Sequence, residues 1–225
     1  MIQIFFLGLT VFTYLFSKKV YQTYKWTLLT PMLITPILLI AVLLLFHIPY
    51  DHYAQGATWL SKLLEPAVVA FAYPLYLYRN TLKKYAVPIV LNVLAGSVIS
   101  IIVSMLLAKV FHLNLAMSDS IVPHIVTTPI AMQISSMAGG TKDLTALFVV
   151  LTAIIGIISG PSIIRILRIR TAVAKGIVMG TSANGTGASR AFEMGQLEGT
   201  IATISMLLTA TFNVFLVPLL LEIMP

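Results

Sequence analysis

The chain has 225 residues, of which 59% are hydrophobic and only 9% are charged, whereas about a quarter of the residues in a soluble domain are charged. A chain of this length forms one domain of ordinary size, so a large core cannot account for the apolar excess. The net charge of +7 does not indicate a nucleic-acid partner, because the basic residues are not gathered in one arm with interleaved aromatic residues. The composition predicts an all-α polytopic membrane protein in contact with the lipid bilayer.

The organisation expected from this composition is a single transmembrane domain over residues 1–225. The absence of cysteine excludes disulfides and thiolate metal sites. We expect neither a cofactor nor a resident metal.

Six hydrophobic stretches follow one another along the chain. Residues 1–17 carry no charge and lack the basic region and cleavage site of a secretory signal, which predicts a retained first helix. Residues 63–78 are shorter and predict a crossing only with a tilt or a break. The other four contain no Asp, Glu, Lys or Arg and are long enough for a hydrocarbon layer of about 30 Å: 28–46, 86–108, 144–164 and 199–221.

The basic residues lie mostly in three connections between these stretches. Residues 17–27, 79–85 and 165–175 hold most of the Lys and Arg, whereas residues 47–60 and 111–118 hold none. Cytoplasmic loops of membrane proteins are enriched in Lys and Arg. The distribution therefore predicts that the first three connections are cytoplasmic, and that the other two and the amino terminus lie outside.

This topology leaves two segments that cannot make a full crossing. Residues 119–140 connect a helix that leaves the cell to one that must re-enter it, and residues 171–196 lie between a cytoplasmic loop and the last helix. We expect two interrupted or re-entrant elements that enter from opposite faces. Unwound backbone at membrane depth is tolerated where protein or a water-filled cavity shields it, as in secondary transporters. Glu65-Pro66 and Thr128-Pro129 each open an apolar stretch that contains Ala, which is compatible with an inverted repeat but is too faint a likeness to establish one.

The first interrupted segment contains a predicted helix start. Thr128 and Pro129 have the residue types of an N-cap and a first turn, and Gly139-Gly140 is expected to end the element. The free amide end, with the hydroxyls of Thr127 and Thr128 and with His124 nearby, predicts a cradle for a small carboxylate. The alternative is that these hydroxyls bond to their own backbone and that His124 is structural.

The second interrupted segment begins with eight small or polar residues, from residue 180 to residue 187. A break in the helix is predicted at 184–187. Glycine lets backbone approach a ligand closely, so Asn184, Gly185 and Thr186 are predicted to contact the substrate. Arg190 would bind a carboxylate through two parallel bonds or pair with Glu193 in its own helix, and the sequence favours neither.

Glu65 is a second titratable candidate. Its carboxylate either couples transport to a proton or caps a helix start beside Pro66 at the membrane interface. The sequence favours the cap.

Three motifs carry a resemblance to a known family. The stretches LEPAVVAFAYPLY (64–76), VTTPIAM (126–132) and GTSANGTGASRAFE (180–193) resemble the signature stretches of the LrgB/CidB family, and the likeness covers nearly the whole chain. The resemblance implies a bacterial inner-membrane protein, often encoded beside a small LrgA/CidA-type membrane partner. Family members are described as holin-like or antiholin-like modulators of murein hydrolase activity and autolysis. Bacterial pyruvate importers and a plastid glycolate/glycerate carrier also belong to it.

Three positions depart from the family pattern. Glu65 stands where Gly is usual, no Lys or Arg lies near His124, and Asn184 replaces a His. These departures flank the predicted site, so the fold is expected to carry over while the substrate and the coupling ion are not defined by the resemblance.

Two functions remain open. The first is a secondary transporter of a small monocarboxylate of the pyruvate, lactate, glycolate or glycerate class, with a midplane site between the two interruptions. The second is a holin-like assembly whose homo-oligomer opens a lesion. A hydrolase in which His124 activates Ser182 or Ser189 is a distant third, because no nucleophile motif such as Gly-x-Ser-x-Gly is present.

Overall fold

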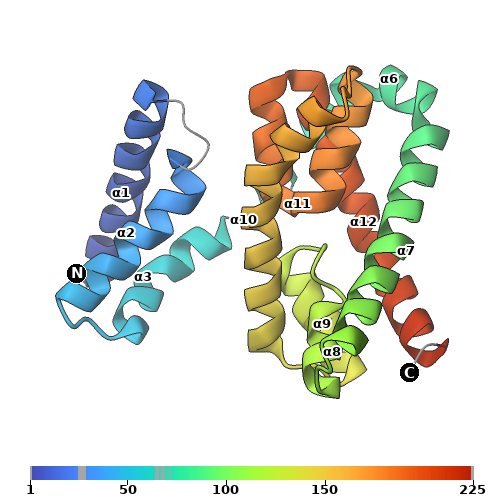
Figure 1. Ribbon diagram of the computed structural model, residues 1–225. Coiled ribbons are helices and arrows are strands. Elements are labelled where there is room, and N and C mark those ends of the chain that lie inside the picture. Colours follow the sequence, from blue (N-terminus) through green and yellow to red (C-terminus); the bar gives the residue numbers. More distant parts are fainter. Residues whose placement is uncertain (1, 25–28, 64–65, 67–68, 71, 224–225) are drawn as a thin grey trace. The chain divides into compact units, whose positions relative to one another are not determined.

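The computed structural model describes residues 2–24, 29–63, 66, 69–70 and 72–223, and all regular structure in these ranges is helical (Figure 1). The all-α prediction is confirmed. Four described helices are long and apolar enough to cross a membrane: Gln3–Tyr24, Ala86–Val110, Lys142–Ile166 and Gln196–Ile223. The chain divides into two compact units, Met1–Tyr73 and Pro74–Pro225, and each is described here by itself.

The first unit contains α1 (Ile2–Tyr24), α2 (Pro31–Leu45) and α3 (Tyr50–Lys62), and α1 contacts the other two helices. The predicted end of the first helix at residue 17 is wrong. No Gly or Pro lies between Ser17 and Tyr24, so α1 continues and carries Lys18 and Lys19 on its final turns. Long basic side chains reach the membrane surface from a helix end, so their charge does not require a loop.

Other predicted boundaries also shift in the structure. The window 28–46 contains α2, which is shorter at 15 residues, and the predicted loop 47–60 contains most of α3. The stretch 63–78 lies partly outside the described residues, and its described end forms α5 (Ala72–Leu77). The predicted loop 79–85 is largely the short helix α6 (Arg79–Lys84).

The second unit is built on three long helices, α7 (Ala86–Val110), α10 (Lys142–Ile166) and α12 (Gln196–Ile223). Each contains one predicted window, so the three predicted long apolar helices are confirmed. Their outer faces expose large apolar side chains, among them Leu91, Ile99 and Ile155, as expected for helices that contact lipid. These apolar outer faces are those of a membrane protein.

The first interrupted element is a helical hairpin made by α8 (Leu115–Ile121), a turn over residues 122–127 and α9 (Thr128–Ala138). It lies at the end of the second unit where α10 begins (Figure 1). Gly139 ends α9 in the left-handed region at φ 100°, and the Gly140 N–H donates to the Ser135 carbonyl at 2.9 Å. The predicted end at Gly139-Gly140 and the predicted interruption of the segment are confirmed.

The second interrupted element is α11 (Ala172–Met194), which lies where α10 ends (Figure 1). In a continuous helix, residues eight positions apart are about 12 Å apart along the axis. Gly187 instead lies so close to Met179 that a Cβ added to Gly187 would overlap the Met179 carbonyl oxygen. The two halves of α11 therefore fold back on each other, and the predicted interruption of this segment is confirmed.

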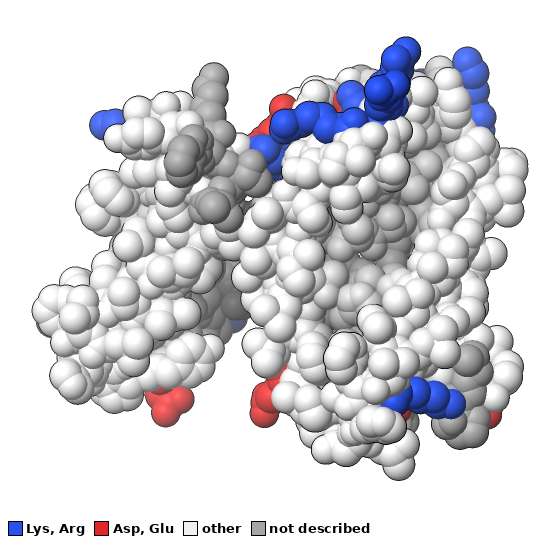
Figure 2. All heavy atoms as spheres, viewed as in Figure 1, with Lys and Arg blue, Asp and Glu red and all other residues white. Residues whose placement is uncertain are grey.

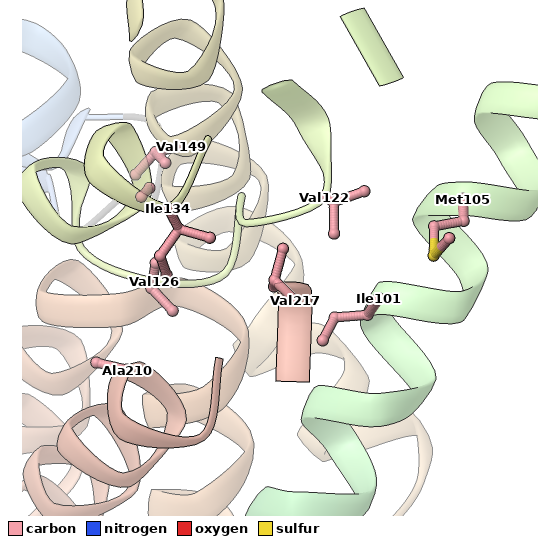
Figure 3. Close-up of a cluster of buried hydrophobic side chains, with 9 residues drawn as sticks. Ile101, Met105, Val122, Val126, Ile134, Val149, Ala210 and Val217 are labelled. Carbon is pink, nitrogen blue, oxygen red and sulfur yellow. The ribbon is translucent and has the colours of Figure 1, made fainter. Parts of the chain in front are cut away.

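A buried apolar cluster holds the first hairpin against the long helices. Figure 3 shows Val122 of the turn near Val217 of α12 and Ile101 of α7, and Val126 of the turn next to Ile134 of α9. Ala210 of α12 belongs to the same cluster. The turn is therefore packed inside protein, which is the condition under which irregular backbone is stable at membrane depth.

Lys and Arg side chains gather at one end of the second unit, over the end of α10 and the start of α11 (Figure 2). Arg165, Arg168 and Arg170 are exposed there. This is the charge asymmetry on which the predicted topology depends.

Candidate functional site

The two hairpins touch at their interruptions. The Asn184 Nδ2 donates to the Val126 carbonyl oxygen at 3.0 Å, in a buried hydrogen bond between residues 58 positions apart. A carbonyl oxygen only accepts, so this bond fixes the orientation of the Asn184 amide. We call the pair Val126–Asn184 the hairpin contact. The two interrupted segments predicted from sequence do meet.

On the first hairpin, the turn leads directly into the start of α9. Thr127 is the N-cap at φ −63° and ψ 144°, and the first helical bond runs from the Ala131 N–H to the Thr127 carbonyl at 2.9 Å. The prediction of Thr128 as the cap is therefore wrong by one residue, and Pro129 falls within the first turn. The Thr127 side chain makes no capping bond. The first N–H groups of a helix have no partner within that helix.

On the second hairpin, Asn184 forms the break itself. Ala183 (φ −135°, ψ 17°) and Asn184 (φ 52°, ψ −139°) are the two non-helical residues of α11. The prediction of a break over 184–187 is wrong for Gly185, Thr186 and Gly187, which are helical. The reason is packing, because Gly187 is needed where the two halves of α11 meet.

The hairpin contact brings two helix starts together. The N-cap of α9, Thr127, directly follows Val126, and the second half of α11 begins directly after Asn184. A helix N-terminus carries partial positive charge and free N–H groups, so each start favours an anion. Thr127 and Thr128 lie at the first start. Thr186 lies at the second, where its hydroxyl donates to the Ala183 carbonyl at 2.6 Å.

Gly185 is open on its exposed side. A Cβ added there would have Met206 Sδ, at 3.8 Å, as its near neighbour. The backbone of Gly185 is therefore not closely packed by neighbouring side chains.

His124 lies in the turn, but its ring is held by neighbouring groups. Its Nδ1 is 2.9 Å from the Ile121 carbonyl oxygen and 3.4 Å from the Ser104 hydroxyl of α7. Because the carbonyl only accepts, Nδ1 carries the hydrogen in this arrangement. The Ser182 and Ser189 hydroxyls donate to carbonyls of their own helix, at 2.6 and 3.0 Å. Within the described residues, no hydrogen bond joins His124 to either serine.

Arg190 and Glu193 form an ion pair within α11. The Arg190 side chain is 18% exposed and the Glu193 side chain 49% exposed. Of the two roles that the sequence left open for Arg190, the structure shows the intrahelical pair. Glu65 lies outside the described residues, so its role in coupling stays a prediction.

The sequence analysis missed a polar row on α12. Ser205, Thr209 and Asn213 are spaced four residues apart on one face of the helix, and all three are fully buried. Thr209 donates to the Ser205 carbonyl and Asn213 Nδ2 to the Thr209 carbonyl, both at 2.8 Å. The signal was present in the sequence, because a row of polar residues in a spanning helix marks a functional candidate. The polar row lies inside the window 199–221, which contains no charged residue and therefore resembles a purely apolar helix.

Comparison with known proteins agrees with this architecture. The model of the LrgB-like family matches residues 10–223. The chain is 49% identical to the protein YwbG of Bacillus subtilis over 218 residues, which are 97% of each chain. It is 34% identical to the holin-like protein CidB of Staphylococcus aureus (strain N315) over 212 residues, which are 94% of this chain and 93% of that relative. No solved structure matches the chain.

Proposed function

The chain belongs to the LrgB-like family, and from this premise we propose that it is a secondary carrier of small monocarboxylates of the pyruvate, lactate, glycolate or glycerate class. One observation carries the proposal: two re-entrant hairpins enter from opposite ends of the second unit and are joined by the buried hydrogen bond between Asn184 and Val126. Interrupted helices that meet inside the membrane form the substrate sites of many secondary transporters. The proposal includes no enzymatic step.

The proposed site lies between the start of α9 and the start of the second half of α11. The carboxylate would accept hydrogen bonds from free N–H groups of these two helix starts and from the hydroxyls of Thr127 and Thr128. Gly185 would allow close approach to the backbone, while Thr186 and Asn184 shape the second start. His124 supports the turn. Arg190 is paired with Glu193 and would not contact the carboxylate directly.

The membrane and the partners belong to the same proposal. We place the protein in the bacterial cell membrane, with the amino terminus outside and the basic end of the second unit in the cytoplasm. A small LrgA/CidA-type membrane protein is the expected partner, and the chain is expected to form a homo-oligomer.

A second function has support from the relatives, because the Staphylococcus proteins are called holin-like. In that role, oligomers would open a nonspecific lesion and modulate murein hydrolase activity and autolysis. A lesion needs amphipathic surfaces, whereas a carrier needs particular side chains at its site. The buried hairpin contact favours the carrier, since a lesion does not require a specific buried contact between two interrupted helices.

Uptake into vesicles separates the two functions. Purified protein in sealed vesicles is given labelled pyruvate, lactate or glycolate, with and without the small partner, while a trapped dye reports leakage. A carrier gives saturable uptake and retains the dye. Dye release with unsaturable entry of all solutes would refute the carrier and support the lesion.

A further inference from the structure

Two buried amide oxygens near the hairpin contact lack a hydrogen-bond donor. Asn184 is 4% exposed and Asn213 is 0% exposed. Each uses its Nδ2 as a donor, to the Val126 and Thr209 carbonyls respectively. Their Oδ1 atoms have no hydrogen-bond partner in the described part of the chain. Because both Nδ2 atoms face carbonyls, exchanging the amide oxygen and nitrogen would replace each hydrogen bond with a contact between two acceptors.

Each asparagine is related to the turn 122–127 in a different way. Asn184 is bonded to the backbone of Val126. Asn213 lies three residues after Ala210 and four before Val217, so the three share one face of α12. That face packs against Val122 and Val126 in the buried cluster of Figure 3. Asn184 is therefore bonded to the turn 122–127 itself, and Asn213 lies on the face of α12 whose apolar residues pack in one cluster with that turn.

The chemistry of these atoms indicates which ligand they would hold. An amide oxygen without a donor is unfavourable in a water-poor interior. It is an acceptor with partial negative charge, so a carboxylate would not satisfy it. A cation would. Transporters with interrupted helices hold their coupling cations on such oxygens and on unwound backbone carbonyls.

The residues also restrict the kind of cation. Calcium and magnesium sites in proteins rely on carboxylate ligands, and zinc relies on His, Cys or carboxylates. The described residues contain no group of three or more His, Asp or Glu side chains that would hold a metal. A set of neutral oxygens fits a small monovalent cation.

We propose that Na⁺ binds beside the turn 122–127, with Asn184 Oδ1 and Asn213 Oδ1 as ligands together with carbonyl oxygens of the turn. Its role in transport rests on the proposed function. A carboxylate at the helix starts would be a buried negative charge, while Arg190 is already paired with Glu193. An adjacent Na⁺ would neutralise that charge and couple uptake to the Na⁺ gradient.

Binding is tested without any transport. Purified full-length protein is melted in detergent in NaCl, KCl or choline chloride at equal ionic strength, and binding of radioactive ²²Na⁺ is measured directly. A ligand that binds the folded state raises the unfolding midpoint. We expect Na⁺ to raise it relative to K⁺ and choline, with saturable ²²Na⁺ binding. A wild-type protein that responds equally to all three salts and binds no ²²Na⁺ would overturn the proposal.

Asn213→Leu tests the ligand, because it leaves the hairpin contact intact. The Na⁺-specific shift and ²²Na⁺ binding should both be lost. Asn92→Leu is the matched control, since Asn92 on α7 also donates to a carbonyl four residues earlier, at 2.8 Å, but is exposed. It should keep both signals. Retention of both signals in Asn213→Leu would exclude Asn213. If Asn213→Leu does not fold, Asn213→Ser is measured instead, with the same expected loss.

The two proposals fail separately. Na⁺ binding without saturable uptake of any of the three carboxylates would leave the cation site in place and refute the carrier. Saturable uptake by a protein that binds no Na⁺ would support the carrier and refute the cation site.

Discussion

Asn184 and Val126, 58 residues apart in the chain, are joined by a hydrogen bond of 3.0 Å between the side-chain nitrogen of the first and the backbone oxygen of the second. Each residue lies where its segment stops being helical. The bond therefore uses a carbonyl that an unbroken helix would have satisfied internally. It is the structural link between the two interrupted elements.

Asn184→Ala should destabilise the protein. The substitution leaves the buried Val126 carbonyl without its donor, which costs about 1–3 kcal/mol. Unfolding midpoints in detergent, compared with those of Asn92→Ala, measure this cost, because Asn92 is exposed. Equal midpoints in the two variants would show that the hairpin contact contributes nothing to stability.

Gly187→Ala and Gly185→Ala should behave differently. A Cβ at Gly187 would overlap the Met179 carbonyl oxygen, whereas a Cβ at Gly185 would have Met206 Sδ as its near neighbour, at 3.8 Å. Overpacking of this kind costs about 1–3 kcal/mol. Thermal unfolding should therefore show a loss only for Gly187→Ala, while Gly185→Ala folds normally and has weaker uptake. The reverse order of stabilities would contradict the folded-back arrangement of α11.

Thr127→Val should weaken uptake without reducing stability. Thr127 is the N-cap of α9 but makes no side-chain capping bond, so removing its hydroxyl removes no capping energy. A lost hydrogen bond to the substrate would cost about 1 kcal/mol, or roughly fivefold in apparent affinity. Concentration-dependent uptake and thermal unfolding are compared with those of Thr211→Val, whose hydroxyl is exposed. Unchanged affinity in Thr127→Val would remove this hydroxyl from the site.

Arg190→Gln and Glu193→Gln should have similar, small effects. The two side chains form an ion pair within α11, and pairs of this kind in accessible positions contribute about 0–1 kcal/mol. Both variants should therefore retain saturable uptake with nearly unchanged apparent affinity. A strong loss of affinity in Arg190→Gln alone would instead show that the guanidinium contacts the carboxylate.

Single cysteines at His112 and Arg170 should label from opposite sides of the membrane. Both positions are exposed, and they lie beyond opposite ends of the long helices of the second unit. The chain contains no native cysteine, so the background is absent. Ser17 is unsuitable as a reporter, because it is fully buried on α1. Labelling of both sites by an impermeant reagent from one side only would contradict the topology.

Composition along the chain determined the three long crossings of the second unit and the course of the segments between them. Lipid selects uninterrupted apolar helices, and the Lys and Arg at residues 165–175 mark one end. With those three helices as crossings, the topology requires residues 119–140 and residues 171–196 each to enter the membrane and return to the same side. The end of α1 was misplaced, because Lys18 and Lys19 resemble a loop in composition although long side chains extend from a helix.

The details of the site were decided by tertiary structure. A glycine-rich stretch is compatible with a loop or with close helix packing, and only the approach of Gly187 to Met179 confined the break to Ala183 and Asn184. The pairing of Asn184 with Val126 and the burial of Asn213 on the face of α12 that carries Ala210 and Val217 depend on which faces of distant segments pack together. Local sequence patterns report the period of a helix and its polarity, but they contain no information about which neighbour each face meets.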